Sequence, residues 1–250
     1  MREKLTAIVP TYNEEKNIEE CLKSISFADE IIVVDSFSTD KTIEIAKKYA
    51  DRVVQHEYRY SAAQKNWIIP QASNEWILIV DADERVPAEL REEILQTLAN
   101  PLCDAYWIGR RNFIGSREIR YGSWGRDKVI RLFRRDKCRY EDKEVHAEVV
   151  VDGKVCRLKN KLIHYTYQNI DEYVKKLIRY AEWGANQRLK EGWRGRWYQI
   201  VFFPIFTFFR NFFINLGFLD GIYGFIVEAL NSWYVFLKYV KLYEKTRPGN

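Results

Sequence analysis

The chain has 250 residues, of which 47% are hydrophobic and 30% charged, with a net charge of +5. This length fits one compact domain or a domain with an appended segment, and the composition excludes a disordered chain. The positive charge is modest and spread along the sequence, which argues against nucleic acid as a partner.

The four cysteines lie far apart in the sequence, with no C-x-x-C spacing. We therefore expect neither a zinc ribbon nor a disulfide framework from Cys21, Cys103, Cys138 and Cys156. Unpaired cysteines are typical of a reducing cytosol. The first residues lead directly into a strand without the apolar region of a signal peptide.

Strands and helices alternate through the first hundred residues. Short apolar runs predict strands, and apolar residues three or four positions apart predict helices. The predicted strands are 5–9, 30–35, 52–56 and 76–80, and the predicted helices are 18–25, 41–49, 62–72 and 87–98. This alternation predicts an α/β fold with parallel strands and right-handed crossovers, in the sheet order 3-2-1-4.

Acidic residues follow two of these strands directly. Asp35 ends the second strand, and Asp81 and Asp83 follow the fourth in the stretch Asp81-Ala82-Asp83. Ligands of α/β sheets bind outside the carboxyl ends of the strands, where Tyr12 also follows the first strand. The residue types fit a nucleotide diphosphate: a ring for stacking, an acceptor for a uracil N–H, and two carboxylates for Mg²⁺ or Mn²⁺.

Each acid also has a plainer interpretation. Asp35 is of a type that caps a turn or a helix, and Asp81 and Asp83 could open the helix that follows Pro87.

The middle of the chain has a different pattern, with strands predicted at 105–113, 128–134 and 162–167. Asp152-Gly153 between two apolar runs predicts a β-hairpin over 149–155. Residues 169–189 place apolar side chains on one side and charged ones around it, which predicts an amphipathic helix.

After residue 196 the composition changes sharply. Residues 201–213 are nearly all apolar or aromatic, but Pro204, Thr207, Arg210 and Asn211 interrupt them, which argues against a simple spanning helix. Residues 217–221 break the helix, and a second one is predicted at 222–243. Its polar side carries Glu228, Asn231, Ser232, Lys238 and Lys241. We interpret 1–195 as the catalytic domain and 196–250 as a helical pair lying in a membrane interface. Alternatively, these helices pack on the catalytic domain or on a second copy of the chain.

Several motifs resemble the nucleotide-sugar half of glycosyltransferase family 2, which has the GT-A fold, a Rossmann-like mixed sheet. They are Ile8-Val9-Pro10-Thr11-Tyr12-Asn13-Glu14-Glu15, Val33-Val34-Asp35-Ser36-Phe37-Ser38-Thr39-Asp40-Lys41-Thr42 and Val80-Asp81-Ala82-Asp83-Glu84-Arg85. More narrowly, the chain resembles the lipopolysaccharide core β-1,4-glucosyltransferase group. The segments that carry this similarity are Ala63-Gln64-Lys65-Asn66-Trp67, Arg131-Leu132-Phe133-Arg134-Arg135, Val145-His146, His164-Tyr165 and Gly217-Phe218-Leu219-Asp220-Gly221.

The resemblance implies an inverting transfer of a hexose from a UDP-sugar. It implies that Pro10, Thr11, Tyr12 and Glu14 surround the base and ribose, that Asp35 contacts the uracil, and that Lys65 lies near the phosphates. It further implies that Asp81 contacts the ribose or the metal, that Asp83 coordinates the metal, and that His164 completes the metal site. Without the family, a histidine within a strand is more often structural.

An inverting transfer needs a general base for the acceptor hydroxyl. The family commonly has Val-His-Glu shortly after the Arg-Leu-Phe-Arg stretch, whereas this chain reads Val145-His146-Ala147-Glu148. Ala147 thus stands at the expected position of the base. Glu148, Glu144 or Asp127 could serve instead, or transfer is impaired in this chain.

These expectations combine into a peripheral enzyme at the cytoplasmic face of the inner membrane. Its acceptor is expected to be a glycolipid, either lipopolysaccharide core or a lipid-linked saccharide. The alternatives are transfer to a polyprenyl phosphate and a catalytically impaired protein that binds sugar nucleotides at the membrane.

Overall fold

The computed structural model describes residues 2–143 and 147–247, which form two compact units. The first unit consists of the chain up to Arg110 together with Lys128–His164. The second consists of Arg111–Asp127 and the chain from Tyr165 onward. Two strands, β6 (Ala105–Ile114) and β11 (Val155–Tyr167), contribute residues to both units.

The main sheet begins with four parallel strands in the order β3-β2-β1-β4, as the sequence predicts. Antiparallel strands continue the sheet in the order β8-β6-β11-β5, and β7 pairs with β6. The bounds are β1 Leu5–Thr11, β2 Glu30–Asp35, β3 Arg52–Gln55, β4 Trp76–Ile79, β5 Glu84–Arg85, β7 Arg117–Ile119 and β8 Lys128–Arg134.

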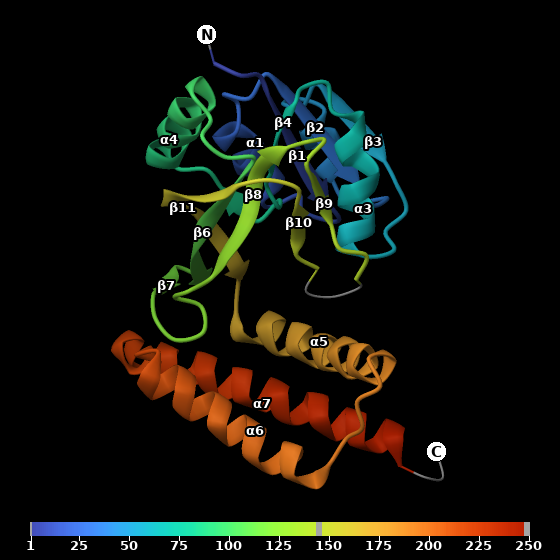
Figure 1. Ribbon diagram of the computed structural model, residues 1–250, viewed down its shortest axis with the longest axis vertical. Helices are drawn as coiled ribbons and strands as arrows, with labels where there is room; N and C mark the ends of the chain where they lie inside the picture. The colour runs from blue at the N-terminus through green and yellow to red at the C-terminus, as the bar shows by residue number, and fades with distance from the viewer. Residues whose placement is uncertain (1, 144–146, 248–250) are drawn as a thin grey trace. The chain divides into compact units, whose positions relative to one another are not determined.

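Helices cover both faces of the parallel strands (Figure 1). Successive strand residues point to opposite faces, so Val9 joins the core under α1, α2 and α4, whereas Ile8 joins the core under α3. Strands buried on both faces explain the unbroken apolar runs in the sequence. The helices are α1 Ile18–Ser24, α2 Thr42–Ala46, α3 Ser61–Ile68 with the 3₁₀ turn Ile69–Gln71, and α4 Ala88–Ala99.

The predicted hairpin at Asp152-Gly153 is wrong. The turn does link β10 (Val149–Val151) to β11, but β10 pairs with β9 (Cys138–Tyr140) in a separate two-stranded sheet. Asp104 explains the departure, because its Oδ2 accepts a hydrogen bond of 2.9 Å from the backbone N–H of Lys154 and so ties the turn to the start of β6. A tertiary contact therefore overrides the local turn signal.

The cysteine spacing indicated no disulfide framework, but the structure contains one disulfide. Cys103 and Cys156 form a disulfide with their Cα atoms 5.9 Å apart, while Cys21 and Cys138 are free and buried. The two bonded residues are 53 positions apart, so spacing gave no signal of their pairing. The cysteines consequently no longer support a reducing compartment.

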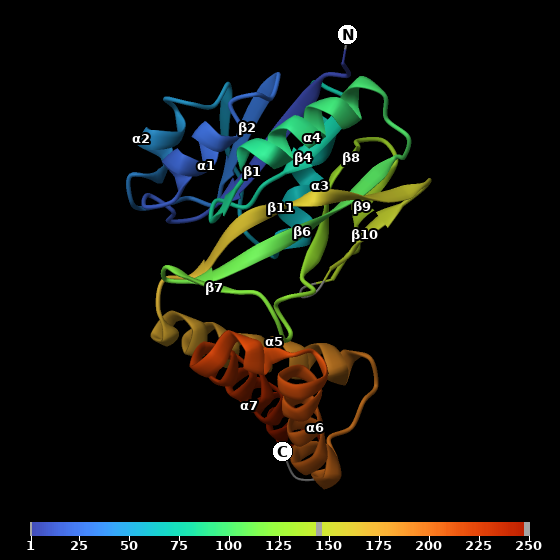
Figure 2. The same ribbon diagram turned by 90° about the vertical axis from the view of Figure 1, so that its left-hand side faces the viewer.

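The second unit is mainly helical, and α7 packs against both α5 and α6 (Figure 2). Its elements are α5 Ile170–Lys190, α6 Trp197–Phe209, the π-helical turn η2 Arg210–Ile214, the 3₁₀ turn η3 Gly217–Asp220 and α7 Gly221–Thr246. Among the described residues no helix alone has the length and apolarity to cross a membrane. One pair bent by 71°, Trp197–Ile214 with Gly217–Thr246, meets those criteria jointly.

Polar residues of α7 that the sequence pattern placed on an outer face are partly internal. Glu228 is 1% exposed, and its Oε1 accepts hydrogen bonds of 2.8 Å from both the backbone N–H and the hydroxyl of Ser123. Asp220 similarly accepts the backbone N–H groups of Arg120 and Tyr121. The compact helical unit thus begins before residue 196 and includes a loop from far earlier in the chain.

Candidate active site

The first unit brings the predicted acidic strand ends to one edge of its sheet. Thr11 at the end of β1 pairs with Asp35 at the end of β2, and Val80 donates a backbone hydrogen bond of 3.0 Å to Ile8 of β1. The segment Asp81-Ala82-Asp83 therefore emerges beside the end of β1. This adjacency is what parallel strands in this order require.

Asp81 lies between two buried cations. Its Oδ1 is 3.0 Å from the Nζ atom of Lys65, and its Oδ2 pairs with the guanidinium of Arg131. Burial alone would raise the pKa of Asp81, but the charges of Arg131 and Lys65 outweigh burial and hold the pKa well below its ordinary value. Asp81 is therefore a fixed anion whose charge two cations already balance.

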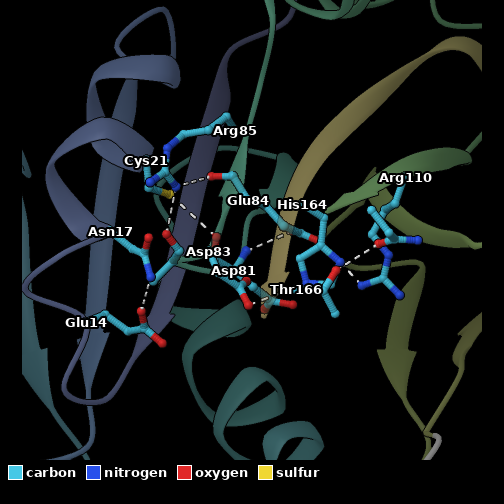
Figure 3. A network of polar contacts seen from close by, with 12 residues as sticks. Glu14, Asn17, Cys21, Asp81, Asp83, Glu84, Arg85, Arg110, His164 and Thr166 are labelled. Atoms are coloured by element: carbon cyan, nitrogen blue, oxygen red, sulfur yellow. Dashed lines mark hydrogen bonds and ion pairs between the residues drawn. The ribbon is translucent and has the colours of Figure 1, made fainter. Parts of the chain in front are cut away.

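Asp83 and His164 face each other, with Oδ2 and Nε2 separated by 3.4 Å (Figure 3). The pairing of β5 with β11 produces this approach, because it sets His164 opposite Glu84, the neighbour of Asp83. Their side chains are 22% and 11% exposed, so both reach the surface. A carboxylate oxygen and an imidazole nitrogen at this separation are two donor groups suited to a divalent cation.

The three predicted metal ligands do not gather into one cluster. Asp81 is engaged with Lys65 and Arg131, and no group of three His, Cys, Asp or Glu residues that could hold a metal occurs in 2–143 and 147–247. Asp83 and His164 remain as a pair. Mg²⁺ is usually held by one or two carboxylates together with substrate phosphates, so a two-residue site fits an ion that arrives with a diphosphate.

A buried acid that the sequence did not single out supports this arrangement. Glu84 is fully buried and accepts hydrogen bonds from Arg131 at 2.9 Å, from Arg110 at 3.4 Å and from the backbone N–H of Asp81 at 3.0 Å. It thereby fixes both the loop of Asp81 and the guanidinium that balances it. The antiparallel register of β4 with β8 pairs Leu78 with Leu132, and it thereby brings the neighbouring Arg131 to Asp81 and Glu84.

At the end of β2, Asp35 is a turn acid. It is fully buried, and its two oxygens accept hydrogen bonds from the backbone N–H and the hydroxyl of Ser38. The hydroxyl of Thr11 is buried without a hydrogen-bond partner among the described residues, and the ring of Tyr12 is 56% exposed. These two groups are placed to meet a ligand, whereas Asp35 already holds the turn in place.

Three other predicted residues have local roles. Pro10 lies within β1, the Oε2 of Glu14 accepts a 2.8 Å hydrogen bond from Asn17, and the carbonyl of Ala82 accepts one of 2.9 Å from Arg85.

The structure describes three of the four positions considered for the general base, Asp127, Ala147 and Glu148. Glu148 is exposed, and its backbone pairs with Glu141 at the start of β10. Asp127 belongs to the helical unit, where its Oδ2 accepts a hydrogen bond of 3.0 Å from Asn112. Ala147 is partly buried, and Glu144 lies outside the described residues.

Comparison with known proteins identifies the family. The model of "Glycosyl transferase family 2" matches residues 6–158. The lipopolysaccharide core biosynthesis glycosyltransferase LpsC of Rhizobium meliloti is 32% identical, over 98% of this chain and 95% of its own length. A glycosyltransferase of Rickettsia bellii described as uncharacterized is 30% identical, over 98% of this chain and 87% of its own.

Solved structures agree on the fold. A mannosyltransferase from Pyrobaculum calidifontis, solved with GDP-Man and Mn²⁺, has a TM-score of 0.60 at 19% identity, covering 98% of this chain and 88% of that one. TarS of S. aureus with UDP-GlcNAc has a TM-score of 0.51 at 16% identity, covering 95% and 92%. The predicted GT-A fold is confirmed, and the chain belongs to glycosyl transferase family 2.

Proposed function

We propose that the chain transfers a hexose from a UDP-sugar, with inversion, to a glycolipid acceptor of the lipopolysaccharide core type at a membrane surface. The observation that carries the proposal is the pair Asp83 and His164 beside Asp81, which Lys65 and Arg131 hold in place. The similarity to LpsC along nearly the whole chain supports the acceptor class.

In this proposal the partly exposed groups bind the metal, and the buried groups contact the phosphates and the nucleoside. Asp83 and His164 would hold Mg²⁺ or Mn²⁺, which when bound stabilises negative charge on the departing diphosphate. Lys65 keeps a buried cation at the phosphate side of the strand ends, and the buried hydroxyl of Thr11 offers a hydrogen bond to the nucleoside. The two solved relatives hold GDP-Man with Mn²⁺ and UDP-GlcNAc, both nucleotide sugars.

The helical unit supports the membrane part of the proposal. Large apolar side chains are exposed along α6 and beyond it, among them Trp197, Phe202, Phe206, Phe209 and Ile214. Exposed apolar surface of this extent is typical of an interaction surface. The proposed site of action is the cytoplasmic face of the inner membrane, with the helices lying in its interface.

The donor part is tested by thermal unfolding with UDP-glucose and Mn²⁺, each alone and together. Because a ligand that binds only the folded state stabilises it by mass action, donor and metal together at about 100 times Kd should stabilise the chain by about 2.7 kcal/mol. Asp83→Asn should abolish the metal-dependent part of this shift.

The matched control is Glu44→Gln, which removes the same charge from an exposed acid on α2 that forms a surface ion pair with Lys48. It should retain the whole shift. If Asp83→Asn and Glu44→Gln respond alike, Asp83 does not hold the metal.

A second candidate function is favoured by Ala147, which occupies the position where the family has its base. A catalytically impaired chain would bind the donor without transferring the sugar. Ala147→Glu should then raise the rate of transfer roughly 100-fold, the usual contribution of a general base, while the donor-induced thermal shift stays unchanged. An unaltered rate in this variant would mean that another acid is the base or that none is needed at this position.

The acceptor class is tested by running the transfer assay with a polyprenyl phosphate and, separately, with a glycosylated lipid. Transfer to the polyprenyl phosphate alone would favour the alternative acceptor.

A further inference from the structure

One lysine of α7 is half-buried without an acidic partner. The Nζ atom of Lys238 lies 5.4 Å from the ring centroid of Tyr234 and 5.1 Å from that of Tyr239. No carboxylate in the part of the chain that the structure describes forms an ion pair or hydrogen bond with this ammonium. A cation taken partly out of water with aromatic rings beside it and no carboxylate partner is incompletely compensated.

Two neighbouring lysines on the same helix show the contrast. Lys241 and Lys245 each lie 2.7 Å from a carboxylate oxygen of Glu182 on α5. The interface between α5 and α7 therefore supplies an acid to these two lysines and none to Lys238.

A glycine on α5 leaves the space that Lys238 occupies. Its stem packs against Gly184 of α5, where a Cβ atom would lie 3.0 Å from the Cδ atom of Lys238 and 3.3 Å from the hydroxyl of Tyr234. A larger residue at 184 would push both side chains away. The absence of a side chain at this position thus makes room for the lysine and the tyrosine.

A second cation, Arg188 of α5, is close enough to Lys238 for its charge to act on it. Burial, and after it the charge of Arg188 on α5, lower the pKa of Lys238 to about 8. Arg188 is itself held by the ring of Trp193, 4.5 Å away, and by Glu191 at 3.3 Å. Glu191 balances the charge of Arg188, whereas no carboxylate among the described residues pairs with Lys238, so a bound anion would offset the charge that remains on Lys238.

Apolar surface adjoins these cations. The ring of Phe203 on α6 meets Tyr239 edge-on at 5.0 Å, and Phe203 is itself exposed next to Phe202 and Phe206. An anion with an apolar tail can therefore contact the cations and the aromatic surface together.

We propose that Arg188, Tyr234, Lys238 and Tyr239, here called the Lys238 cluster, bind the phosphate of an anionic phospholipid whose acyl chains lie along α6. The proposal rests on the membrane-surface part of the proposed function. The lysine and arginine supply charge-assisted hydrogen bonds to the phosphate oxygens, and the tyrosine hydroxyls are further donors.

The test is sedimentation of the full chain with vesicles of pure phosphatidylcholine and with vesicles containing phosphatidylglycerol. The variants are Lys238→Gln, Arg188→Gln and the control Lys241→Gln, each of which lowers the net charge by one. General attraction to an anionic surface should change similarly in all three. Loss of a charge-assisted contact should weaken binding to the phosphatidylglycerol vesicles about tenfold more in Lys238→Gln and Arg188→Gln than in Lys241→Gln.

Equal weakening in all three variants would overturn the site and leave only general attraction. Inorganic phosphate that displaces the chain from vesicles at the same phosphate concentration would overturn the choice of a lipid. Lys238→Gln removes an unpaired charge, so it should fold, and Arg188→Gln tests the same site independently. The thermal shift with UDP-glucose and Mn²⁺ is measured on every variant, so a failed donor site is distinguished from a failed lipid site.

Discussion

Asp81 forms ion pairs with two buried cations. Its carboxylate balances Lys65 and Arg131, both of which are almost fully buried. Buried ion pairs contribute little net stability when compared with apolar residues, but removing one partner leaves an uncompensated charge. Asp81 therefore stabilises the loop from which Asp83 projects.

Asp81→Asn should lower the free energy of unfolding by about 3 kcal/mol, because Lys65 loses its carboxylate while Arg131 retains Glu84. The measurement is urea denaturation at neutral pH. The folded-state pKa of Asp81 is depressed, so its stabilisation is present above the unfolded pKa of about 4 and is lost as pH falls below it. The difference between wild type and variant should accordingly shrink in acid. A variant as stable as the wild type at neutral pH would contradict this role.

At this scale the sequence predicted the acids but not their partners. A strand that ends in Asp81-Ala82-Asp83 is visible from local pattern alone. Arg131 and Glu84 act through the antiparallel register of β4 with β8, a long-range pairing that no local pattern encodes.

At the scale of elements, the loop of residues 120–124 takes its shape from η3 and α7. Asp220 accepts two of its backbone N–H groups, and Glu228 accepts the N–H and hydroxyl of Ser123. The hydroxyl of Ser123 also accepts a hydrogen bond of 2.6 Å from Asn231, whose Oδ1 accepts one from Tyr173 of α5. A buried, fully connected polar network of this kind fixes a single loop conformation.

Gly122→Ala tests this network. Gly122 has a φ of +67°, and a Cβ atom there would lie 2.1 Å from Oε1 of Glu228. The control is Gly192→Ala, whose φ of +80° imposes similar backbone strain but whose Cβ would meet nothing within 4 Å. Both variants should lose about 1 kcal/mol to strain, and Gly122→Ala should lose roughly 2 kcal/mol more in thermal or urea unfolding because Glu228 is displaced. Equal losses would show that the network is not tight at Gly122.

The helices were predicted well in position and less well in orientation. The predicted helix 222–243 is α7, but the sequence assigned Glu228 and Asn231 to an outer face. Their polar character fits an outer face equally well. Contacts with Ser123 bury Glu228, and contacts with Ser123 and with Tyr173 of α5 leave Asn231 half-buried.

At the scale of the whole molecule, the helical unit is larger than the segment 196–250 marked by its composition. It also contains α5 and Arg111–Asp127. Removing the chain after residue 196 would leave the loop of Ser123 without Glu228, so truncation confounds membrane binding with unfolding. Point substitutions on the exposed apolar surface are the cleaner test.

Phe206→Ser combined with Phe209→Ser should abolish flotation with liposomes while leaving the donor-induced thermal shift intact. These rings are 62% and 55% exposed, so their loss costs little folding stability but removes roughly 3 kcal/mol or more of apolar transfer into the membrane. The control is Leu102→Ser, an exposed apolar residue of the first unit. Undiminished flotation of the double variant would exclude this surface as the membrane contact.

The division of the chain between two units also sets an order of folding during synthesis. Every described residue of the first unit has been made once His164 is added, so the proposed donor site can form early. Residues 111–127 are made before His164. Their loop nevertheless lacks its hydrogen-bond acceptors until Asp220 and Glu228 have been made. Domains generally fold as units while the chain emerges. The newly made protein is thus expected to gain its nucleotide site before the loop of residues 120–124 and its apolar helices are settled.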